Sequence, residues 1–313
     1  MKKAWILISL VIFTSCSMDN NRIQNENLET TLIDELKSSL TTNNPNSTSD
    51  ENEPTTEIKE AISIINEEGK TIEKRFNTPD GFERIKVEDG SYGQYLRTFQ
   101  LKPNGSKVHY YNGDVKPWDV HEAVLDIDVG EKDLQQCADA VMRLRAEYLY
   151  GKGLYNKIHF NFTNGFKADY SNWMQGNRIA VSGNKVHWVK RSGYSKEYSS
   201  FRDYLDMVFS YAGTLSLSRE MQKTTIEEMR IGDVFLKGGT PGHCVIIMDM
   251  AENKETGEKL FMLAQSYMPA QEIHVLKNPE NTDLSPWYSV EFDDTLNTPE
   301  WQFSRDQLYR FKD

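Results

Sequence analysis

Residues 231–271 constrain the fold of this chain more than any other part of the sequence. They contain two apolar runs, residues 244–248 and 260–264, which are joined by a polar loop over residues 251–258. Two such runs on either side of a charged loop with a glycine predict an antiparallel β-hairpin. A shorter apolar run, residues 234–236, follows a Gly-Asp pair just before them. We therefore expect these segments to form the centre of an antiparallel sheet.

His243 stands at the start of the second of these three strands. Side chains alternate along a strand, so His243 shares a face with Val245, whereas Cys244 points to the opposite face. Folding of the hairpin brings either Gln265 or Ser266 beside His243, depending on the register that the turn selects. A histidine that acts as a base needs such a neighbour to fix its tautomer and orientation.

Cys137 is the candidate thiol partner of this histidine. A helical pattern begins at Asp133, where Asp133 and Gln136 form a predicted capping box, and it continues to about Tyr150. Cys137 lies on the inward stripe, one turn inside the helix, where the helix dipole favours a thiolate. The alternative is a small core residue, because free cysteine is among the most buried residue types.

The first sixteen residues predict export to the cell envelope. Lys2 and Lys3 precede an apolar run over residues 4–13, which is too short to span a membrane and typical of a signal peptide. Cys16 follows Thr-Ser, as in the bacterial lipobox, where the cysteine is lipidated and becomes the mature N-terminus. A plain signal peptide with an incidental cysteine is the alternative. Lipidation would anchor the protein to a membrane, in the outer membrane, the periplasm or facing the surface.

Composition divides the rest of the chain into a tether and a folded domain. Residues 17–70 are rich in Asn, Ser, Thr, Asp and Glu, which predicts a disordered tether, with a short amphipathic helix where Ile58, Ile62 and Ile65 recur. Residues 71–313 contain no internal repeat and no linker. We predict one α+β domain there, with a central antiparallel sheet and packed helices.

Two further elements of this domain are predicted with clear patterns. Residues 95–101 and 107–111 are strand-like and flank a Pro-Asn-Gly-Ser turn, which predicts a second hairpin. Residues 200–212 carry apolar side chains at helical spacing, and Gly213 follows them as a helix stop.

Charge and cysteine content exclude several classes of function. A net charge of -11 argues against nucleic acid as a partner. With Cys16 lipidated, only Cys137 and Cys244 remain, so the domain is no disulfide scaffold, although one bridge between them stays open. The 6 histidines show no HxxxH or HxH spacing, and we predict no metal and no cofactor. Asp126 and Asp128 share a strand face, which is more typical of solvated carboxylates than of metal ligands.

The order of a cysteine at a helix start, a histidine at a strand start and a polar residue on the next strand resembles the papain-like cell-wall hydrolases of the NlpC/P60 and CHAP type. The half-motif GDVFLKGG-PGHCVIIM is similar to their signature. The resemblance implies a papain-like core with Cys137 as nucleophile, His243 as general base and Gln265 as the residue that orients it. One departure is the spacing, because the family's cysteine lies much nearer the Gly-Asp strand. The helix at that position here carries Ser199 and Ser200 and no cysteine.

From about Thr71 to its end, the chain resembles more closely a family of bacterial lipoproteins that share a domain of unknown function. The motifs that carry this resemblance are YLRTFQLKPNGSKVHYYNG, DLQQCADAVMRLRAEYLY, GDVFLKGGTPGHCVIIMDMA, LAQSYMPAQ and TPEW. The resemblance implies no activity.

Two functions follow as hypotheses. The first is a lipid-anchored cysteine hydrolase or amidase of the cell envelope, acting on amide bonds of peptides or peptidoglycan. The second is a non-catalytic envelope module that binds glycan or peptide in a degenerate papain-like cleft. The separation of the Cys137 sulfur from the His243 ring distinguishes them.

Overall fold

A large antiparallel sheet organises the described part of the chain, residues 63–312 of the computed structural model. The predicted signal peptide, the lipidated Cys16 and the tether up to residue 62 lie outside these residues. The sheet has the order β2-β11-β10-β9-β8-β15-β7, with β1 added to β9 and β12 added to β10. Its strands are β1 (Phe82–Arg84), β2 (His121–Val124), β7 (Gln222–Lys223), β8 (Val234–Lys237), β9 (His243–Asn253), β10 (Lys259–Gln265), β11 (His274–Leu276), β12 (Trp287–Ser289) and β15 (Leu308–Arg310).

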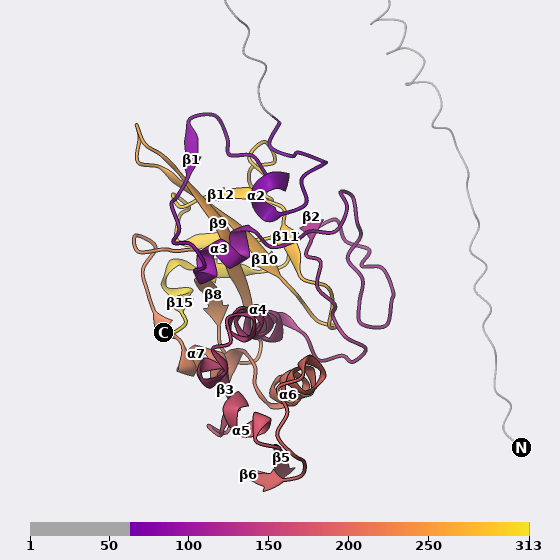
Figure 1. Ribbon diagram of the computed structural model, residues 1–313. Coiled ribbons are helices and arrows are strands. Elements are labelled where there is room, and N and C mark those ends of the chain that lie inside the picture. Colours follow the sequence, from indigo (N-terminus) through magenta and orange to yellow (C-terminus); the bar gives the residue numbers. More distant parts are fainter. Residues whose placement is uncertain (1–62, 313) are drawn as a thin grey trace, which may run out of the picture. The chain divides into compact units, whose positions relative to one another are not determined.

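Helices and three small hairpins surround this sheet (Figure 1). The helices are α2 (Ile72–Arg75), α3 (Tyr92–Arg97), α4 (Cys137–Gly151), α5 (Tyr170–Met174), α6 (Tyr198–Tyr211) and α7 (Thr214–Glu220), with the 3-10 turns η1 (Tyr155–Lys157) and η2 (Arg305–Gln307). The hairpins pair β3 (His159–Asn161) with β4 (Lys167–Asp169), β5 (Asn177–Ser182) with β6 (Lys185–Lys190) and β13 (Thr295–Asn297) with β14 (Gln302–Ser304). The predicted α+β class with a central antiparallel sheet is confirmed.

The predicted central hairpin is also confirmed, as β9 paired with β10, and its core is covered on both faces. On one face Cys244, Ile246 and Met248 join the larger apolar cluster, which includes α4. On the other face Val245 and Ile247 join a smaller cluster with residues of β10, β12 and β14. Because both faces of β9 are buried, its sequence is a nearly continuous apolar run. It lacks the alternation that is typical of a strand with one face in water.

The predicted hairpin over residues 95–101 and 107–111 is wrong. Tyr92–Arg97 form helix α3, and the hydroxyl of Ser91 caps it by accepting from the backbone N–H of Gln94. Tyr92, Tyr95 and Phe99 stack along one side of this segment at helical spacing, with ring centroids 6.2 Å and 5.4 Å apart. Their β-propensity suggested a strand, but this local stacking and the cap favour the helix.

The beginning of the described chain departs from the predicted tether. Ile65 forms a β-bridge with Phe76, and the backbone N–H of Asn66 donates to the carbonyl of Arg75. The last residues assigned to the tether and its helix thus pair with the domain. The helix predicted over residues 200–212 is confirmed as α6, whereas the β5–β6 hairpin had no prediction.

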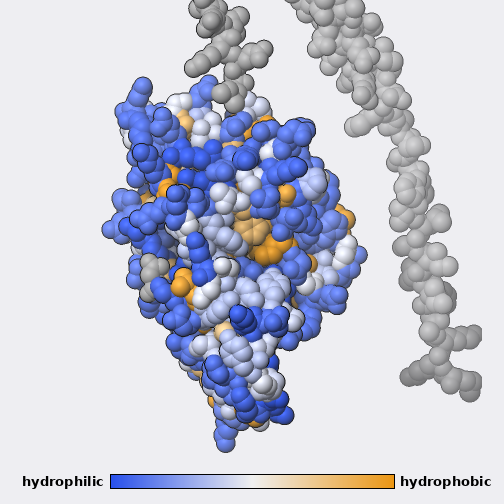
Figure 2. Space-filling view, in the orientation of Figure 1, coloured by the Kyte–Doolittle hydropathy of each residue, from blue (hydrophilic) through white to orange (hydrophobic). Residues whose placement is uncertain are grey.

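The surface on the face seen in Figure 2 is mostly hydrophilic, with small scattered apolar patches. Within residues 63–312, no helix combines the length and the apolar character that a membrane span requires.

One buried carboxylate joins the N-terminal part of the domain to β9. Asp249 accepts from Arg84 Nε at 2.7 Å and from Arg97 Nε at 2.6 Å, and its side chain is fully buried. Arg84 ends β1 and Arg97 ends α3, so this single side chain ties both elements to the central strand. Buried charges persist only where such partners compensate their lost hydration.

Replacement of Asp249 by Asn is therefore expected to cost about 3–5 kcal/mol of unfolding free energy, because two arginines are left without their countercharge. Urea denaturation followed by tryptophan fluorescence measures this loss. Glu252→Gln on the same strand is the control, since its ion pair with Lys254 is exposed and its removal should leave the midpoint unchanged. Similar losses in both variants would contradict the role given to Asp249.

Candidate active site

The first residue of β9 and the last residue of β10 lie side by side, because the two strands run antiparallel. His243 Nε2 lies 2.8 Å from Gln265 Oε1, and both side chains are buried. The hydroxyl of Ser266, the other candidate, instead lies within hydrogen-bonding distance of the backbone carbonyls of Gln135 and Gln271. Of the two residues left open by the sequence, Gln265 contacts the histidine.

A shift in register makes this choice. Met262 pairs with Asp249, but Leu263 pairs with Ile247 and Ala264 with Ile246, so one residue of β9 is skipped at this point. The shifted register continues to place Gln265 opposite Val245, on the face of His243. Without the bulge, Ser266 would take that position.

The hydrogen bonds of Gln265 fix the tautomer of His243. Gln265 Nε2 donates to Glu300 Oε2 at 2.7 Å and lies 3.4 Å from His274 Nε2. A carboxylate only accepts, so the amide nitrogen faces Glu300 and the amide oxygen faces His243. His243 Nε2 must then carry the proton, which leaves Nδ1 with a free lone pair. That nitrogen is the one available as a base.

The ring of His274 is oriented in the complementary way. Its Nδ1 lies 2.9 Å from the carbonyl oxygen of Glu272 and donates to it, so its Nε2 accepts from Gln265. Both hydrogens of the Gln265 amide are therefore used, and the amide cannot flip without loss of these contacts.

Sequence reasoning missed the ion pair behind Gln265. Lys116 Nζ lies 2.7 Å and 2.8 Å from the two oxygens of Glu300 and 2.8 Å from Gln271 Oε1. Burial lowers the pKa of Lys116, while Glu300 opposes this shift. Glu300 belongs to the TPEW motif, which marked only the family, and no local pattern distinguishes Lys116. The pair is made by residues far apart in the chain.

Aromatic rings enclose the imidazole of His243. The ring centroids of Tyr267, Trp301 and Phe303 lie 4.7 Å, 5.3 Å and 5.9 Å away. Burial, together with the charge of Lys116, lowers the pKa of His243 to about 4, although the bond to Gln265 acts in the opposite direction. The ring is thus neutral at neutral pH.

Cys137 is the first residue of α4, one turn earlier in the helix than predicted, because Gln136 is the N-cap in place of Asp133. The backbone N–H groups of Cys137, Ala138 and Cys244 lie near its sulfur and act to lower the pKa of the thiol. Burial and the neighbouring Asp139 outweigh them and raise the pKa of the thiol to about 11. The expected net stabilisation of the thiolate is therefore wrong for this conformation.

The structure brings Cys137 to the start of β9, since its sulfur contacts the N–H of the residue after His243. Among residues 63–312, however, no hydrogen bond joins this thiol to the His243 ring. Cys137 packs with Cys244 in the larger apolar cluster, whereas the His243 ring stacks on Phe303 of the smaller one. The two groups approach the strand end from different faces. Both cysteines are free thiols.

The other residues weighed from the sequence have structural partners. Ser200, near the start of the helix where the papain-like resemblance would expect a cysteine, accepts from Trp173 Nε1 at 3.1 Å and is buried. Asp128 forms ion pairs with Arg143 and Arg202. Within residues 63–312, no group of three or more His, Cys, Asp or Glu side chains is arranged to hold a metal ion.

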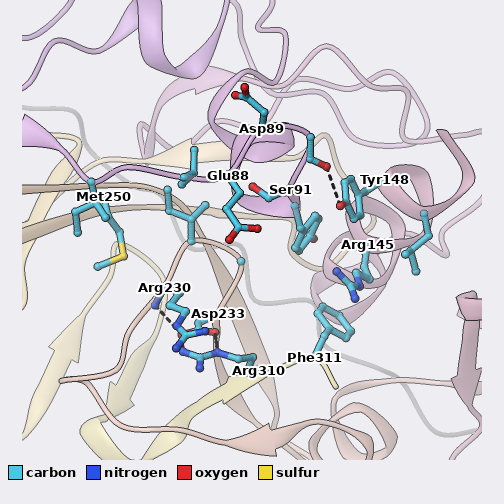
Figure 3. A pocket seen from close by; sticks show the side chains of 18 of the residues that line it. Glu88, Asp89, Ser91, Arg145, Tyr148, Arg230, Asp233, Met250, Arg310 and Phe311 are labelled. Carbon is cyan, nitrogen blue, oxygen red and sulfur yellow. Dashed lines mark hydrogen bonds and ion pairs between the residues drawn. The ribbon is translucent and has the colours of Figure 1, made fainter. Parts of the chain in front are cut away.

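A cavity of about 620 Å³ lies beside the C-terminal half of α4, and none of the predicted site residues lines it. Figure 3 shows the guanidinium of Arg145 close to Phe311 and the ion pair of Arg310 with Asp233. The hydroxyl of Tyr148 donates to the carbonyl of Gly90. Arg145 thus joins α4 to the residue after β15, and Tyr148 joins α4 to the segment before α3.

Fold and site together define a class of α+β domain. It has a buried histidine of fixed orientation at one end of its central hairpin, and a thiol at a helix start lies near the same strand end. The model of the family described as Domain of unknown function (4846), DUF4846, matches residues 72–310. The chain belongs to this family. No curated protein and no solved structure matches it, so the papain-like core stays a prediction.

The tautomer of His243 is directly testable. We expect Nε2 to be protonated at neutral pH and the ring to titrate near pH 4, because burial disfavours the imidazolium. Long-range ¹H–¹⁵N spectra of the imidazoles measure both properties, with His243→Asn for assignment. Gln265→Leu should release the tautomer into a mixture. A pKa of His243 near 6.5 in the native chain would contradict the lowered pKa that burial of the ring predicts.

Proposed function

We propose that this protein hydrolyses amide bonds through Cys137, with His243 as the general base and Gln265 as the residue that orients it. The chain of hydrogen bonds from Glu300 through Gln265 to His243 carries the proposal, because it leaves Nδ1 as a proton acceptor. The Cys137 thiol, which lies near the start of β9, is the group from which this base would take a proton.

The chemistry proceeds by acyl transfer. His243 Nδ1 takes the proton of the Cys137 thiol as the sulfur attacks the carbonyl carbon of the amide. The oxygen becomes an oxyanion, for which the backbone N–H groups of Cys137 and Ala138 are suitable donors once the sulfur has moved away from them. The imidazolium then protonates the leaving amine, and the thioester is hydrolysed by water that His243 deprotonates. The free enzyme regains its thiol and its neutral ring.

The thiol must first move toward the ring. In the present conformation the pKa of Cys137 is raised to about 11 and that of His243 is lowered to about 4, so the proton stays on sulfur. A rotation of the thiol around the start of β9, with displacement of an aromatic neighbour such as Tyr267, would bring the two groups together. Substrate binding would supply the free energy for this step.

We place the substrate in the cell envelope, as a peptide or the peptide part of peptidoglycan. The proposal rests on the predicted signal peptide and on Cys16 as the lipidated residue, which give the membrane as a partner. Cys16→Ser should move the full chain from the membrane fraction to the soluble envelope fraction, detected by immunoblot. Unchanged fractionation would contradict the anchor.

Loss of the nucleophile is the central test. Purified peptidoglycan is incubated with the protein, and newly exposed amines are quantified by mass spectrometry. Cys137→Ala should reduce the rate at least about a thousand-fold, and Gln265→Ala less, because it removes orientation and not the attacking atom. Cys244→Ala is the matched control, since its side chain points away from His243 and activity should persist. Equal rates for Cys137→Ala and the native chain would refute the proposal.

A non-catalytic module that binds glycan or peptide is the second candidate. This candidate is favoured because, within residues 63–312, no hydrogen bond joins the Cys137 thiol to the His243 imidazole, and because both groups are buried. Iodoacetamide distinguishes the candidates, because a working site must open and expose Cys137. Faster alkylation of Cys137 than of Cys244, accelerated by peptidoglycan, supports the hydrolase. Equal and slow alkylation of both, with retained binding of peptidoglycan, supports the module.

A further inference from the structure

A small cavity of about 230 Å³ lies between the segment that leads into α4 and helix α6. It is lined by residues 129–132, Leu134 and Gln135 on one side and by Arg202, Asp206 and Phe209 of α6 on the other. Gln135 lies two positions before Cys137, so the cavity adjoins the candidate thiol along the chain.

Gln135 presents an unused hydrogen-bond donor there. Gln135 is 1 % exposed, and its Oε1 accepts from Arg143 Nη1 at 3.1 Å. A guanidinium only donates, so the amide oxygen must face Arg143 and the amide cannot flip. Its Nε2 is buried and has no partner among residues 63–312. A buried N–H group without an acceptor is costly, which makes this atom notable.

Arg202 presents a second unused donor at the same cavity. Its Nη2 donates to Asp128 Oδ1 at 3.1 Å, while its Nη1 is buried and has no partner within the described residues. Gly130 lies on the opposite wall with a φ of +81°, and a Cβ there would lie 3.4 Å from Arg202 Nη2. Gln135 and Arg202 thus line the same cavity, and each has one buried donor without a partner among the described residues.

The charges around the cavity select the kind of acceptor. Asp128 is shared by Arg143 and Arg202, and Arg143 is also paired with Glu147, so these four groups balance. Two unused donors, one of them on a guanidinium, suit the two oxygens of a carboxylate. Asp206 is paired with Lys132, and the remaining charge of Glu131 opposes a doubly charged phosphate more strongly than a singly charged carboxylate.

We propose that this cavity binds the carboxylate of a peptide, with Gln135 Nε2 and Arg202 Nη1 each donating to one oxygen. The assignment of this carboxylate to the substrate of Cys137 rests on the proposed function, whereas the binding itself does not. The substrate class is then a peptide that bears a free carboxylate near the amide to be cleaved.

Binding is tested in the full chain with Cys137→Ala, so that turnover cannot interfere. Calorimetry or NMR titration compares N-acetylglycine with N-acetylglycinamide, which has the same shape without the charge. The acid should bind at least about ten-fold more tightly than the amide, because only a carboxylate forms charge-assisted bonds with both donors.

Variants identify the donors. Gln135→Glu keeps an acceptor for Arg143 but replaces the free donor by an acceptor, and it should abolish the preference for the acid. Arg202→Gln should weaken binding of the acid about ten-fold or more. Lys132→Gln is the matched control, since this lysine lines the cavity but pairs with Asp206 at the exposed rim and should change affinity about two-fold at most. Thermal unfolding confirms that each variant is folded.

Equal affinities for acid and amide, or a preference unaffected by Gln135→Glu, would show that the cavity holds only water and overturn the proposal. The two proposals fail separately. Binding of the acid without amide hydrolysis by the native chain leaves the carboxylate site intact and refutes the hydrolase. Hydrolysis without preference for the acid refutes the carboxylate site alone.

Discussion

The pairing of β9 with β10 is the constraint on which the rest of the domain depends. Apolar clusters cover both faces of the paired strands, and the pairing fixes which side chains meet at the end of the hairpin. A shift of one residue would exchange the faces, so that Gln265 would point toward α4 and Ser266 toward the ring of His243. The bulge after Met262 therefore determines the candidate site as directly as the identity of any of its residues.

The sequence predicts this hairpin because its apolar runs and polar loop are local patterns. For the partner of His243 the sequence leaves two candidates, Gln265 and Ser266, because a β-bulge leaves no clear signal in a single sequence. The ion pair of Lys116 with Glu300 has no signal either, because it joins residues that only the folded sheet brings together. The strand predicted over part of helix α3 is wrong for a different reason: aromatic residues favour strands in general, but here they pack on one another along the helix and Ser91 caps it.

Burial dominates the electrostatics of the site. A pKa of the Cys137 thiol raised from 9.0 to about 11 corresponds to about 3 kcal/mol against the thiolate. The N-terminus of a helix contributes about 0.3–1 kcal/mol in the opposite direction. The helix start therefore cannot activate the thiol while it is buried. Activation requires a change of environment, and the aromatic rings around His243 are the part of the site that would have to yield.

The segment before α4 connects the carboxylate cavity to the strand ends. The hydroxyl of Ser266 lies 3.0 Å from the carbonyl of Gln135, and the N–H of Ala270 donates to Asp133 at 2.7 Å. The chain that follows β10 is thus bound to the residues just before Cys137. A ligand that draws Gln135 toward Arg202 acts on this segment and, through it, on the position of the thiol. The proposed carboxylate site and the proposed nucleophile are therefore held by the same short segment, which the chain after β10 fixes in place.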